Sequence, residues 1–264
     1  MKRSSVIAIL TDFGTMDAYV ASMHGVILSI SPNAKIIDIS HSIEPQNIDE
    51  AAYILWTSFR YFPKHTTFLC VVDPGVGSNR NIICVETQDY RFIAPDNGLL
   101  KYVLDFVHRP KIIAVKNQEY FLPHVSSTFH GRDIFAPIAA HLANGLSPSK
   151  LGPRTTPLFH AEQFVEVDTL FNDVYYGSII HIDYFGNIIT NYLVKENKNK
   201  ILRLSIGKKT IHKKYSSYSD APLRTPFQIV GSSGLLELVV KNGKATDYIS
   251  VPIKSRIKLT VSDD

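Results

Sequence analysis

The stretch Val71-Val72-Asp73-Pro74-Gly75-Val76-Gly77-Ser78-Asn79-Arg80 decides how the first half of this chain is interpreted. It joins two apolar runs, residues 67–72 and 82–85, and so predicts a strand, a turn rich in proline and glycine, and a second strand. The turn holds a carboxylate, Asp73, and a guanidinium, Arg80. A carboxylate just beyond a buried strand lies where open α/β sheets bind ligands, although an ordinary surface ion pair fits the same pattern.

A second carboxylate, Asp12, follows the first apolar run, residues 6–10. Beyond it, apolar side chains recur at helical spacing between Ala18 and Ser29. Asp12 therefore lies between a predicted strand and a predicted helix. There it could accept two hydrogen bonds from a vicinal diol, as acidic residues do for ribose hydroxyls. The alternative is a helix cap or a turn residue.

Strands and helices alternate along the first half of the chain. Further strands are predicted at residues 34–43 and 91–94, and helices at residues 48–61 and 99–104. This alternation is typical of the α/β class, with a mostly parallel sheet covered by helices.

The pattern changes after residues 147–157, a segment with three prolines and no apolar periodicity that we interpret as a linker. Beyond it, short β-rich runs dominate, at residues 177–183, 187–192, 201–204, 227–230, 235–240 and 257–261. Such runs predict a smaller all-β domain of barrel-like form. We therefore expect an N-terminal α/β domain at residues 1–155 and a C-terminal β-barrel-like domain at residues 165–264.

The composition is typical of a soluble protein. The chain has 264 residues and a formal net charge of +4, and it has no apolar run long enough to span a membrane. Its N-terminus lacks the features of a secretion signal, so we expect a cytoplasmic location and no membrane association. The lysines of the second half lack interleaved aromatic residues, which favours a solvated face over nucleic-acid binding; they stand at positions 195, 198, 200, 208, 209, 213 and 214.

Two kinds of site are disfavoured by the sequence. Cys70 and Cys84 both lie inside apolar runs, which predicts small buried side chains rather than a disulfide or a zinc site, and we expect no metal. His41 stands between two serines, but no nucleophilic serine elbow or cysteine accompanies it. A Ser-His-Asp hydrolase is therefore disfavoured.

His130 is a further candidate, in the segment Ser127-Thr128-Phe129-His130-Gly131-Arg132-Asp133 that leads into an apolar helix. The positive end of the helix would disfavour the protonated imidazole. A lone histidine before a helix is more often a cap or packing residue, and it becomes a catalytic candidate only together with Asp73 and Arg80.

The second half offers a turn, Asp183-Tyr184-Phe185-Gly186-Asn187, that combines an acid, two aromatic rings and an amide. Phe185 could stack on a planar base whose edge Asn187 hydrogen-bonds, or the turn is simply a hairpin corner. A later turn, Gly231-Ser232-Ser233-Gly234, could present hydroxyls and amides to a carboxylate, and it lacks the lysine of a Walker-type phosphate loop.

Taken together and in order, these motifs closely resemble those of the S-adenosylmethionine hydroxide adenosyltransferase family, the adenosine-forming S-adenosylmethionine hydrolases once called a domain of unknown function. The motifs are Thr11-Asp12-Phe13-Gly14 with Asp17, residues 71–80, residues 94–100, residues 129–133 and residues 183–191. The family is related to fluorinating and chlorinating enzymes that use the same substrate. The resemblance spans nearly the whole chain and implies a homotrimer, with active sites between one subunit's first domain and a neighbour's second.

The reaction that the resemblance implies is hydrolysis of S-adenosyl-L-methionine to adenosine and L-methionine, with no cofactor. Methionine leaves the ribose C5′ as a neutral thioether, so what is scarce at neutral pH is a nucleophile. Asp73, Arg80 and His130 match the family's catalytic triad, in which the guanidinium would stabilise developing hydroxide and the other two would orient water and manage its proton. The residues leave open which of Asp73 and His130 accepts that proton.

The resemblance also implies the ligand contacts. Asp12 matches the ribose-diol carboxylate, and Phe185 and Asn187 match contacts to adenine. The methionine portion would be held by a further set, Asp183 and Ser232, with Glu237 meeting its ammonium. Two departures affect fine details of ligand contact: His24 stands where relatives often carry lysine, and Ser233 where many have an aromatic residue.

Two alternatives to hydrolysis follow from the same residues. Halogenating relatives hold their anion with tyrosine and threonine at the positions of Asp73 and Val76, and they lack the histidine that matches His130. A carboxylate at Asp73 would repel a halide by an amount on the order of a few kcal/mol. The other alternative is a non-catalytic module that senses adenosine or S-adenosylmethionine, which would not need the triad.

Overall fold

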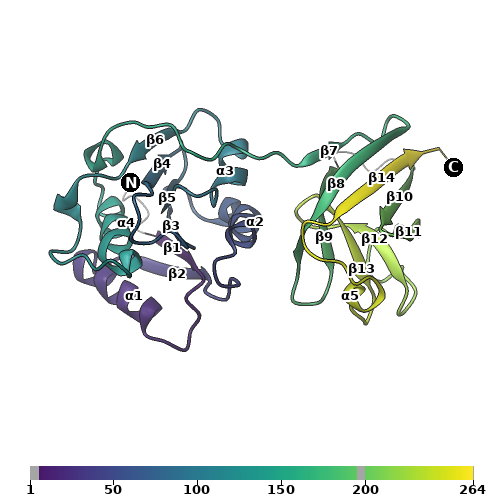
Figure 1. Ribbon diagram of the computed structural model, residues 1–264, viewed down its shortest axis with the longest axis horizontal. Helices are drawn as coiled ribbons and strands as arrows, with labels where there is room; N and C mark the ends of the chain where they lie inside the picture. Colours follow the sequence, from purple (N-terminus) through teal and green to yellow (C-terminus); the bar gives the residue numbers. More distant parts are fainter. Residues whose placement is uncertain (1–5, 195–199, 264) are drawn as a thin grey trace. The chain divides into compact units, whose positions relative to one another are not determined.

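The computed structural model describes residues 6–194 and 200–263. The chain divides into two compact units, Met1–Glu162 and Gln163–Asp264, each described separately below (Figure 1). Lys195 and Lys198 of the expected solvated face lie outside the described residues. Within the described ranges, no helix combines the length and apolar character that crossing a membrane requires.

The first unit is built on a six-stranded sheet in the order β2-β1-β3-β5-β4-β6. Its strands are β1 (Val6–Thr11), β2 (Lys35–Ser40), β3 (Thr67–Val71), β4 (Ile82–Glu86), β5 (Arg91–Pro95) and β6 (Lys111–Ala114). The pairs β1–β2, β1–β3 and β3–β5 are parallel, whereas β4 runs antiparallel to both β5 and β6. The predicted mostly parallel sheet is therefore confirmed.

The two strands that flank residues 72–81 are not neighbours, because β5 lies between β3 and β4. Ile82, the first residue of β4, pairs with Pro95, the last residue of β5. The segment 72–81 therefore passes over the carboxyl end of β5 and does not form a tight hairpin turn. The backbone N–H of Asp96 donates to the carbonyl of Asn81 at 3.0 Å and fixes this crossing.

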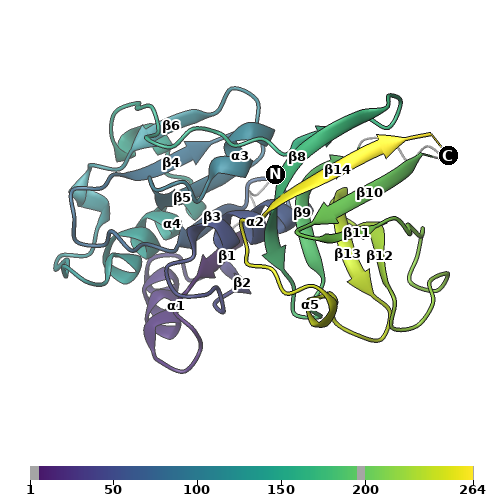
Figure 2. The ribbon, with the colours of Figure 1, turned by 45° about the vertical axis from the view of Figure 1, so that its right-hand side comes forward.

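Helices cover both faces of this sheet, as predicted (Figure 2). They are α1 (Tyr19–Ile30), α2 (Ile48–Ser58), α3 (Lys101–Phe106) and α4 (Ala136–Ala143), with a one-turn 3-10 helix at Phe59–Tyr61 after α2 and another at Gln118–Tyr120. Leu69 packs in one core with side chains of α1 and α4. Its neighbour Phe68 stacks on Phe92 and meets Phe59 edge to face on the other side, as the two-residue period of a strand requires.

The segment 147–157 is not a free linker. It contains a 3-10 helix, Pro148–Leu151, and its backbone then runs beside β6. Ala114 N–H donates to the carbonyl of Pro153 at 2.9 Å, and Thr155 N–H donates to that of Ile112 at 3.0 Å. Proline is tolerated at such an edge because it has no backbone N–H to donate to a neighbouring strand. The first unit continues to Glu162, whose carboxylate forms an ion pair with Lys101 at 2.6 Å.

The second unit is a smaller all-β domain, as predicted. Its strands are β7 (Val165–Val167), β8 (Asp173–Ile182), β9 (Ile188–Val194), β10 (Ile201–Ile206), β11 (Lys209–Ile211), β12 (Pro226–Val230), β13 (Leu235–Val240) and β14 (Arg256–Ser262), with one short helix, α5 (Ala245–Tyr248). The path runs β11-β10-β14-β8-β9-β13-β12, and β7 pairs with β9. Every pairing on this path is antiparallel.

The two ends of this path approach each other, which gives the sheet its barrel-like form. Gln228 on β12 donates its backbone N–H to the carbonyl of Lys213 at 2.7 Å, just after β11. Its side-chain amide donates to the carbonyl of Ile211 at 2.8 Å. Inside, Tyr192 is fully buried and donates to the carbonyl of Ile257 at 2.9 Å, which links β9 to β14 across the core.

Candidate active site

The two acids that follow strands β1 and β3 lie at the same edge of the first sheet. Thr11 and Val71, the last residues of these parallel strands, are paired in register. Asp12 and Asp73 therefore leave the sheet close together, at the carboxyl ends where α/β sheets bind ligands. Both carboxylates line one cavity of about 480 Å³, together with His130.

Asp73, Arg80 and His130 form one hydrogen-bonded network within the first unit. Arg80 donates through Nε to Asp73 Oδ1 at 2.8 Å and through Nη2 to Asp73 Oδ2. The same Nη2 lies 3.1 Å from Nδ1 of His130. The Asp73 and Arg80 side chains are only 4% and 11% exposed, so they form a buried ion pair and not a surface pair.

The network determines which ring nitrogen of His130 carries the proton. A guanidinium only donates hydrogen bonds, so Nδ1 must accept from Arg80, and the single proton of the neutral ring is on Nε2. Burial lowers the pKa of His130, and the charge of Arg80 lowers it further against the opposing charge of Asp73. The predicted preference for a neutral imidazole is thus confirmed in direction, but burial and Arg80 are its causes.

Two loops hold this network in place. His130 precedes a π-helical turn, Gly131–Phe135, that leads into α4. Fully buried Asp133 forms an ion pair with Arg132 and accepts the backbone N–H of Ser126 at 2.8 Å, which anchors the approach to His130. Gly77 has a φ of +78°, and a Cβ there would stand 2.5 Å from the carbonyl oxygen of Ser127. The loop after β3 therefore touches the loop before His130 through a glycine.

Asp12 lines the cavity and does not cap α1. One carboxylate oxygen, Oδ2, accepts the backbone N–H of Gln46 at 2.8 Å. The other, Oδ1, has no hydrogen-bond partner in the part of the chain that the structure describes. The residue that precedes α1 is Ala18, which makes no side-chain cap. The helix-cap alternative is therefore excluded.

Three aromatic rings border the same cavity, and sequence reasoning did not identify them as functional. Phe13, Tyr19 and Phe129 contact one another with ring centroids 5.1 to 6.0 Å apart. All three line the cavity beside Asp12. The available signal was their position, because each lies within or next to a motif that carries a candidate acid or histidine. Together they form an apolar wall of tilted and edge-to-face rings beside two carboxylates.

In the second unit, Asp183 organises the β8–β9 turn. Its Oδ1 accepts the backbone N–H of Phe185 at 2.9 Å and of Asn187 at 2.8 Å, and its Oδ2 accepts the Asn187 side-chain amide at 2.8 Å. Gly186 takes a left-handed conformation, with a φ of +79°, that closes the turn. The hairpin-corner interpretation is correct, and the same corner leaves the Phe185 ring 71% exposed.

Phe185 and Asn187 line a second cavity, of about 570 Å³, that lies within the second unit. Tyr218, which sequence reasoning missed, lines it too. Ser232 is exposed in the turn before β13 and does not line this cavity. Phe185 and Asn187 therefore share a cavity whose lining does not include Ser232.

Glu237 on β13 has an unusual environment. Burial raises the pKa of its carboxyl to about 7, and the negative charge of Asp183 contributes in the same direction. A cation beside these two carboxylates would relieve their mutual repulsion. An ammonium group is therefore a suitable ligand for this part of the second unit.

Comparisons with known proteins cover both units. The family model for the SAM hydroxide adenosyltransferase N-terminal domain matches residues 7–152, and the model for the C-terminal domain matches residues 177–258. A protein of Methanocaldococcus jannaschii named (R)-S-adenosyl-L-methionine hydrolase is 42% identical over 193 residues, which are 70% of this chain and 66% of that protein.

A protein of the same name from Thermus thermophilus is 32% identical over 249 residues, 92% of this chain and 94% of the relative. The crystal structure of a conserved protein from Thermotoga maritima superposes with a TM-score of 0.85 at 34% identity, and the match covers 96% of this chain and 99% of that one. Proteins named fluorinase are also similar; the one from Actinoplanes sp. is 29% identical over 212 residues, 70% of this chain and 71% of its own.

Replacing Gly77 by alanine should separate the two loops. The left-handed backbone costs an L-residue about 1 kcal/mol, and the new Cβ must in addition push Ser127 away. We expect the Arg80–His130 hydrogen bond to lengthen, so that the pKa of His130 rises toward its ordinary value in an NMR titration. Gly145→Ala is the matched control, since Gly145 has a φ of +96° and nothing lies within 4 Å of its added Cβ. Equal effects of the two substitutions on His130 would contradict the proposed contact.

Replacing Glu237 by glutamine should change how stability depends on pH. The folded carboxyl has a pKa of about 7 against an ordinary value of 4.5, so its contribution is present at low pH and is lost as pH rises through about 7. We expect the variant to match the wild type near pH 5 and to exceed it at pH 8, by about 1 to 2 kcal/mol after allowing for solvent screening. Hydrogen exchange of the β13 amides measures this difference. An identical pH profile for the two proteins would refute the assignment.

Proposed function

The chain belongs to the S-adenosylmethionine hydroxide adenosyltransferase family, and from this we propose that it hydrolyses S-adenosyl-L-methionine to adenosine and L-methionine. The names of the relatives from Methanocaldococcus jannaschii and Thermus thermophilus support this activity. The observation that carries the proposal is the buried network of Asp73, Arg80 and His130, which shares a cavity with Asp12.

The reaction places a specific demand on the site. Methionine departs from C5′ as a neutral thioether, so no acid is needed to protonate it. Water, by contrast, is a weak nucleophile and hydroxide is dilute near neutral pH. The site must hold one water in line behind C5′, remove its solvation and accept its proton as the new C–O bond forms.

We assign to Asp73 the role of accepting the proton from the attacking water. His130 cannot take it at Nδ1, where Arg80 donates, and its Nε2 already carries the ring proton. Asp73 lines the cavity and has lone pairs beyond those that Arg80 uses, so it can accept a hydrogen bond from water and then its proton. Arg80 stabilises the developing negative charge. His130 holds the guanidinium in place through Nδ1.

Substrate recognition follows from the remaining groups. In this proposal Asp12 Oδ1 binds the ribose diol beside the backbone of Gln46, and the Phe13–Tyr19–Phe129 wall covers the apolar face of the nucleoside. Residues of the second unit complete the set: Phe185 and Asn187 bind adenine, Asp183 and Ser232 contact the amino acid portion of methionine, and Glu237 binds its ammonium group. The pKa of Glu237, near 7, supports its ammonium role.

The assembly belongs to the proposal as well. We propose a homotrimer in which the first unit of one subunit and the second unit of its neighbour supply the two halves of each site. No cofactor is required, because the leaving group is activated in the substrate itself. We also propose that the protein works in the cytoplasm and that it binds neither membranes nor nucleic acid.

Halide transfer is the nearest alternative, because proteins named fluorinase are similar to the chain. The buried carboxylate of Asp73 argues against it. A halide in the water position would meet this carboxylate, whose counter-charge Arg80 is already engaged by three hydrogen bonds to it. Two anions in a partly dry cavity repel each other, whereas a neutral water is attracted. A sensor without catalysis would bind the nucleoside and would leave the buried network without a role.

Labelled water tests the reaction directly. Purified protein incubated with S-adenosylmethionine in H₂¹⁸O should release adenosine that carries one ¹⁸O at its 5′-hydroxyl, as detected by mass spectrometry. Addition of chloride or fluoride should produce no 5′-halogenated nucleoside. Unlabelled adenosine would exclude attack by water at C5′. The absence of any turnover, with adenosine still bound, would instead favour the sensor.

Two aspartate variants separate chemistry from binding. Asp73→Asn removes the proton acceptor and should lower kcat by about 10² to 10⁴ while adenosine affinity changes little. Asp12→Asn keeps the acceptor and should raise KM by about tenfold or more, because it weakens the charge-assisted bonds to the diol. Asp105→Asn, an exposed carboxylate on α3, is the control that should leave both parameters unchanged. The division of roles is wrong if Asp12→Asn abolishes turnover at unchanged affinity.

A further inference from the structure

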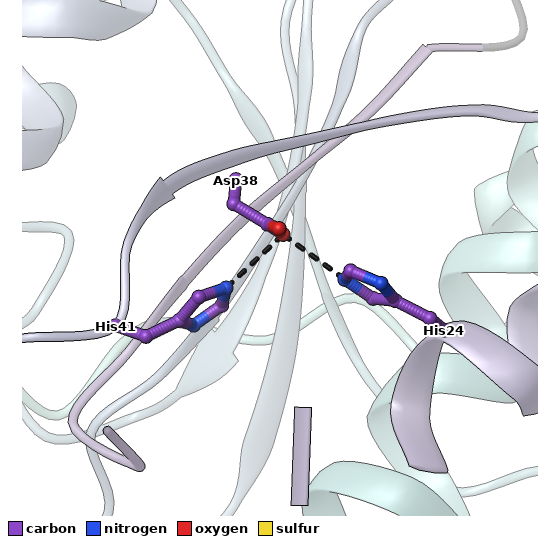
Figure 3. Close-up of side chains that lie close together, drawn as sticks. All are labelled: His24, Asp38 and His41. Carbon is purple, nitrogen blue, oxygen red and sulfur yellow. Dashed lines mark hydrogen bonds and ion pairs between the residues drawn. The ribbon is translucent and has the colours of Figure 1, made fainter. Parts of the chain in front are cut away.

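A cluster of two histidines and one aspartate lies in the first unit, outside the proposed catalytic network. His24 projects from α1, Asp38 from β2 and His41 from the segment that follows β2. Figure 3 shows both imidazole rings turned toward the carboxylate of Asp38. The donor atoms of the three side chains all lie within 4.8 Å of one another.

The contacts in this cluster converge on a single oxygen. His24 Nε2 lies 3.0 Å from Asp38 Oδ1, and His41 Nε2 lies 3.0 Å from the same atom. Two imidazole nitrogens and one carboxylate oxygen are the donor set that zinc and related first-row divalent ions prefer. A tetrahedral ion with bonds of about 2.0 to 2.1 Å places its ligand atoms roughly 3.3 Å apart. The two nitrogen-to-oxygen distances of 3.0 Å are close to this value, and all three donor atoms lie within 4.8 Å of one another.

His41 supplies an independent observation. The residue is 6% exposed, and its Nε2 is buried without a hydrogen-bond partner, because the approach to Asp38 does not have hydrogen-bond geometry. Buried polar nitrogens are almost always satisfied, so a buried Nε2 that faces a carboxylate without a hydrogen bond leaves its binding capacity open for a ligand. An ion in the cluster would occupy its lone pair.

The surroundings fit a metal ligand as well. His41 Nδ1 lies 2.8 Å from Thr11 Oγ1, which also accepts the backbone N–H of Phe13 at 3.2 Å. A hydrogen bond at the second ring nitrogen is how proteins orient metal-binding histidines and fix their tautomer. The other two ligands are reachable from solvent, since the His24 and Asp38 side chains are 29% and 42% exposed.

We propose that His24, Asp38 and His41 bind one Zn²⁺ ion, or a similar first-row divalent cation, with water in the remaining coordination position. The ion would tie α1, β2 and the segment after β2 together. That segment continues to Gln46, whose backbone holds Asp12, so the ion would stiffen one wall of the cavity without touching the reacting atoms. The expectation that the chain binds no metal rested on the position of Cys70 and Cys84 inside apolar runs, whereas these three ligands are two histidines and an aspartate from separate elements.

Zinc titration of the full-length chain tests the site. After removal of metals with a chelator, calorimetry should show one saturable Zn²⁺ ion per chain, and Zn²⁺ should raise the melting temperature. His24→Lys should weaken binding by at least about a hundredfold, since an ammonium can pair with Asp38 but cannot ligate a metal. Asp38→Asn should weaken it similarly and shows whether the loss is specific to the lysine.

His212→Lys is the matched control, because His212 is an exposed histidine outside the cluster, and it should bind Zn²⁺ like the wild type. Co²⁺ provides a second readout, since its visible absorption reports imidazole ligation and should disappear in both cluster variants. The proposal is overturned if the wild type shows no saturable Zn²⁺ binding. It is equally overturned if His24→Lys and Asp38→Asn, folded as judged by circular dichroism, bind the ion with unchanged affinity.

Discussion

The buried ion pair between Asp73 and Arg80 is the interaction on which the candidate site depends. A carboxylate 4% exposed and a guanidinium 11% exposed are stable there only as partners, because loss of either leaves an uncompensated charge at a cost of about 3 to 5 kcal/mol. The pair also fixes His130, since Arg80 shares its Nη2 between the two side chains. One guanidinium thus pairs with a buried acid, sets the tautomer of a histidine and links two loops.

The sequence predicted most of the first unit because strand ends and motifs coincide in it. Asp12 and Asp73 were recognisable as acids at strand ends, and the parallel register of Thr11 with Val71 explains why they lie together. The aromatic wall escaped prediction, since Phe13, Tyr19 and Phe129 meet only after α1 and α4 have packed side by side. Local patterns do not specify such contacts between distant segments.

Two other features were inaccessible to sequence reasoning for related reasons. The proline-rich segment 147–157 resembles a linker, but its hydrogen bonds to β6 depend on the edge of a sheet formed 35 residues or more earlier in the chain. The pKa of Glu237 depends on burial and on the charge of Asp183, which the β8–β9 turn brings close. Both features arise from tertiary contacts, whereas propensity and periodicity report only neighbours along the chain.

The path of residues 72–81 over the end of β5 has an evolutionary consequence. Asp73 and Arg80 lie in one short connection whose two ends are fixed by strands β3 and β4 of the same sheet. His130, by contrast, lies on a separate loop before the turn Gly131–Phe135. Substitutions in this one connection can therefore change Asp73 and Arg80 together, without any change in the strands of the sheet. A change of nucleophile would therefore involve this connection and the loop that carries His130, whereas the nucleoside pocket beside them could stay unchanged.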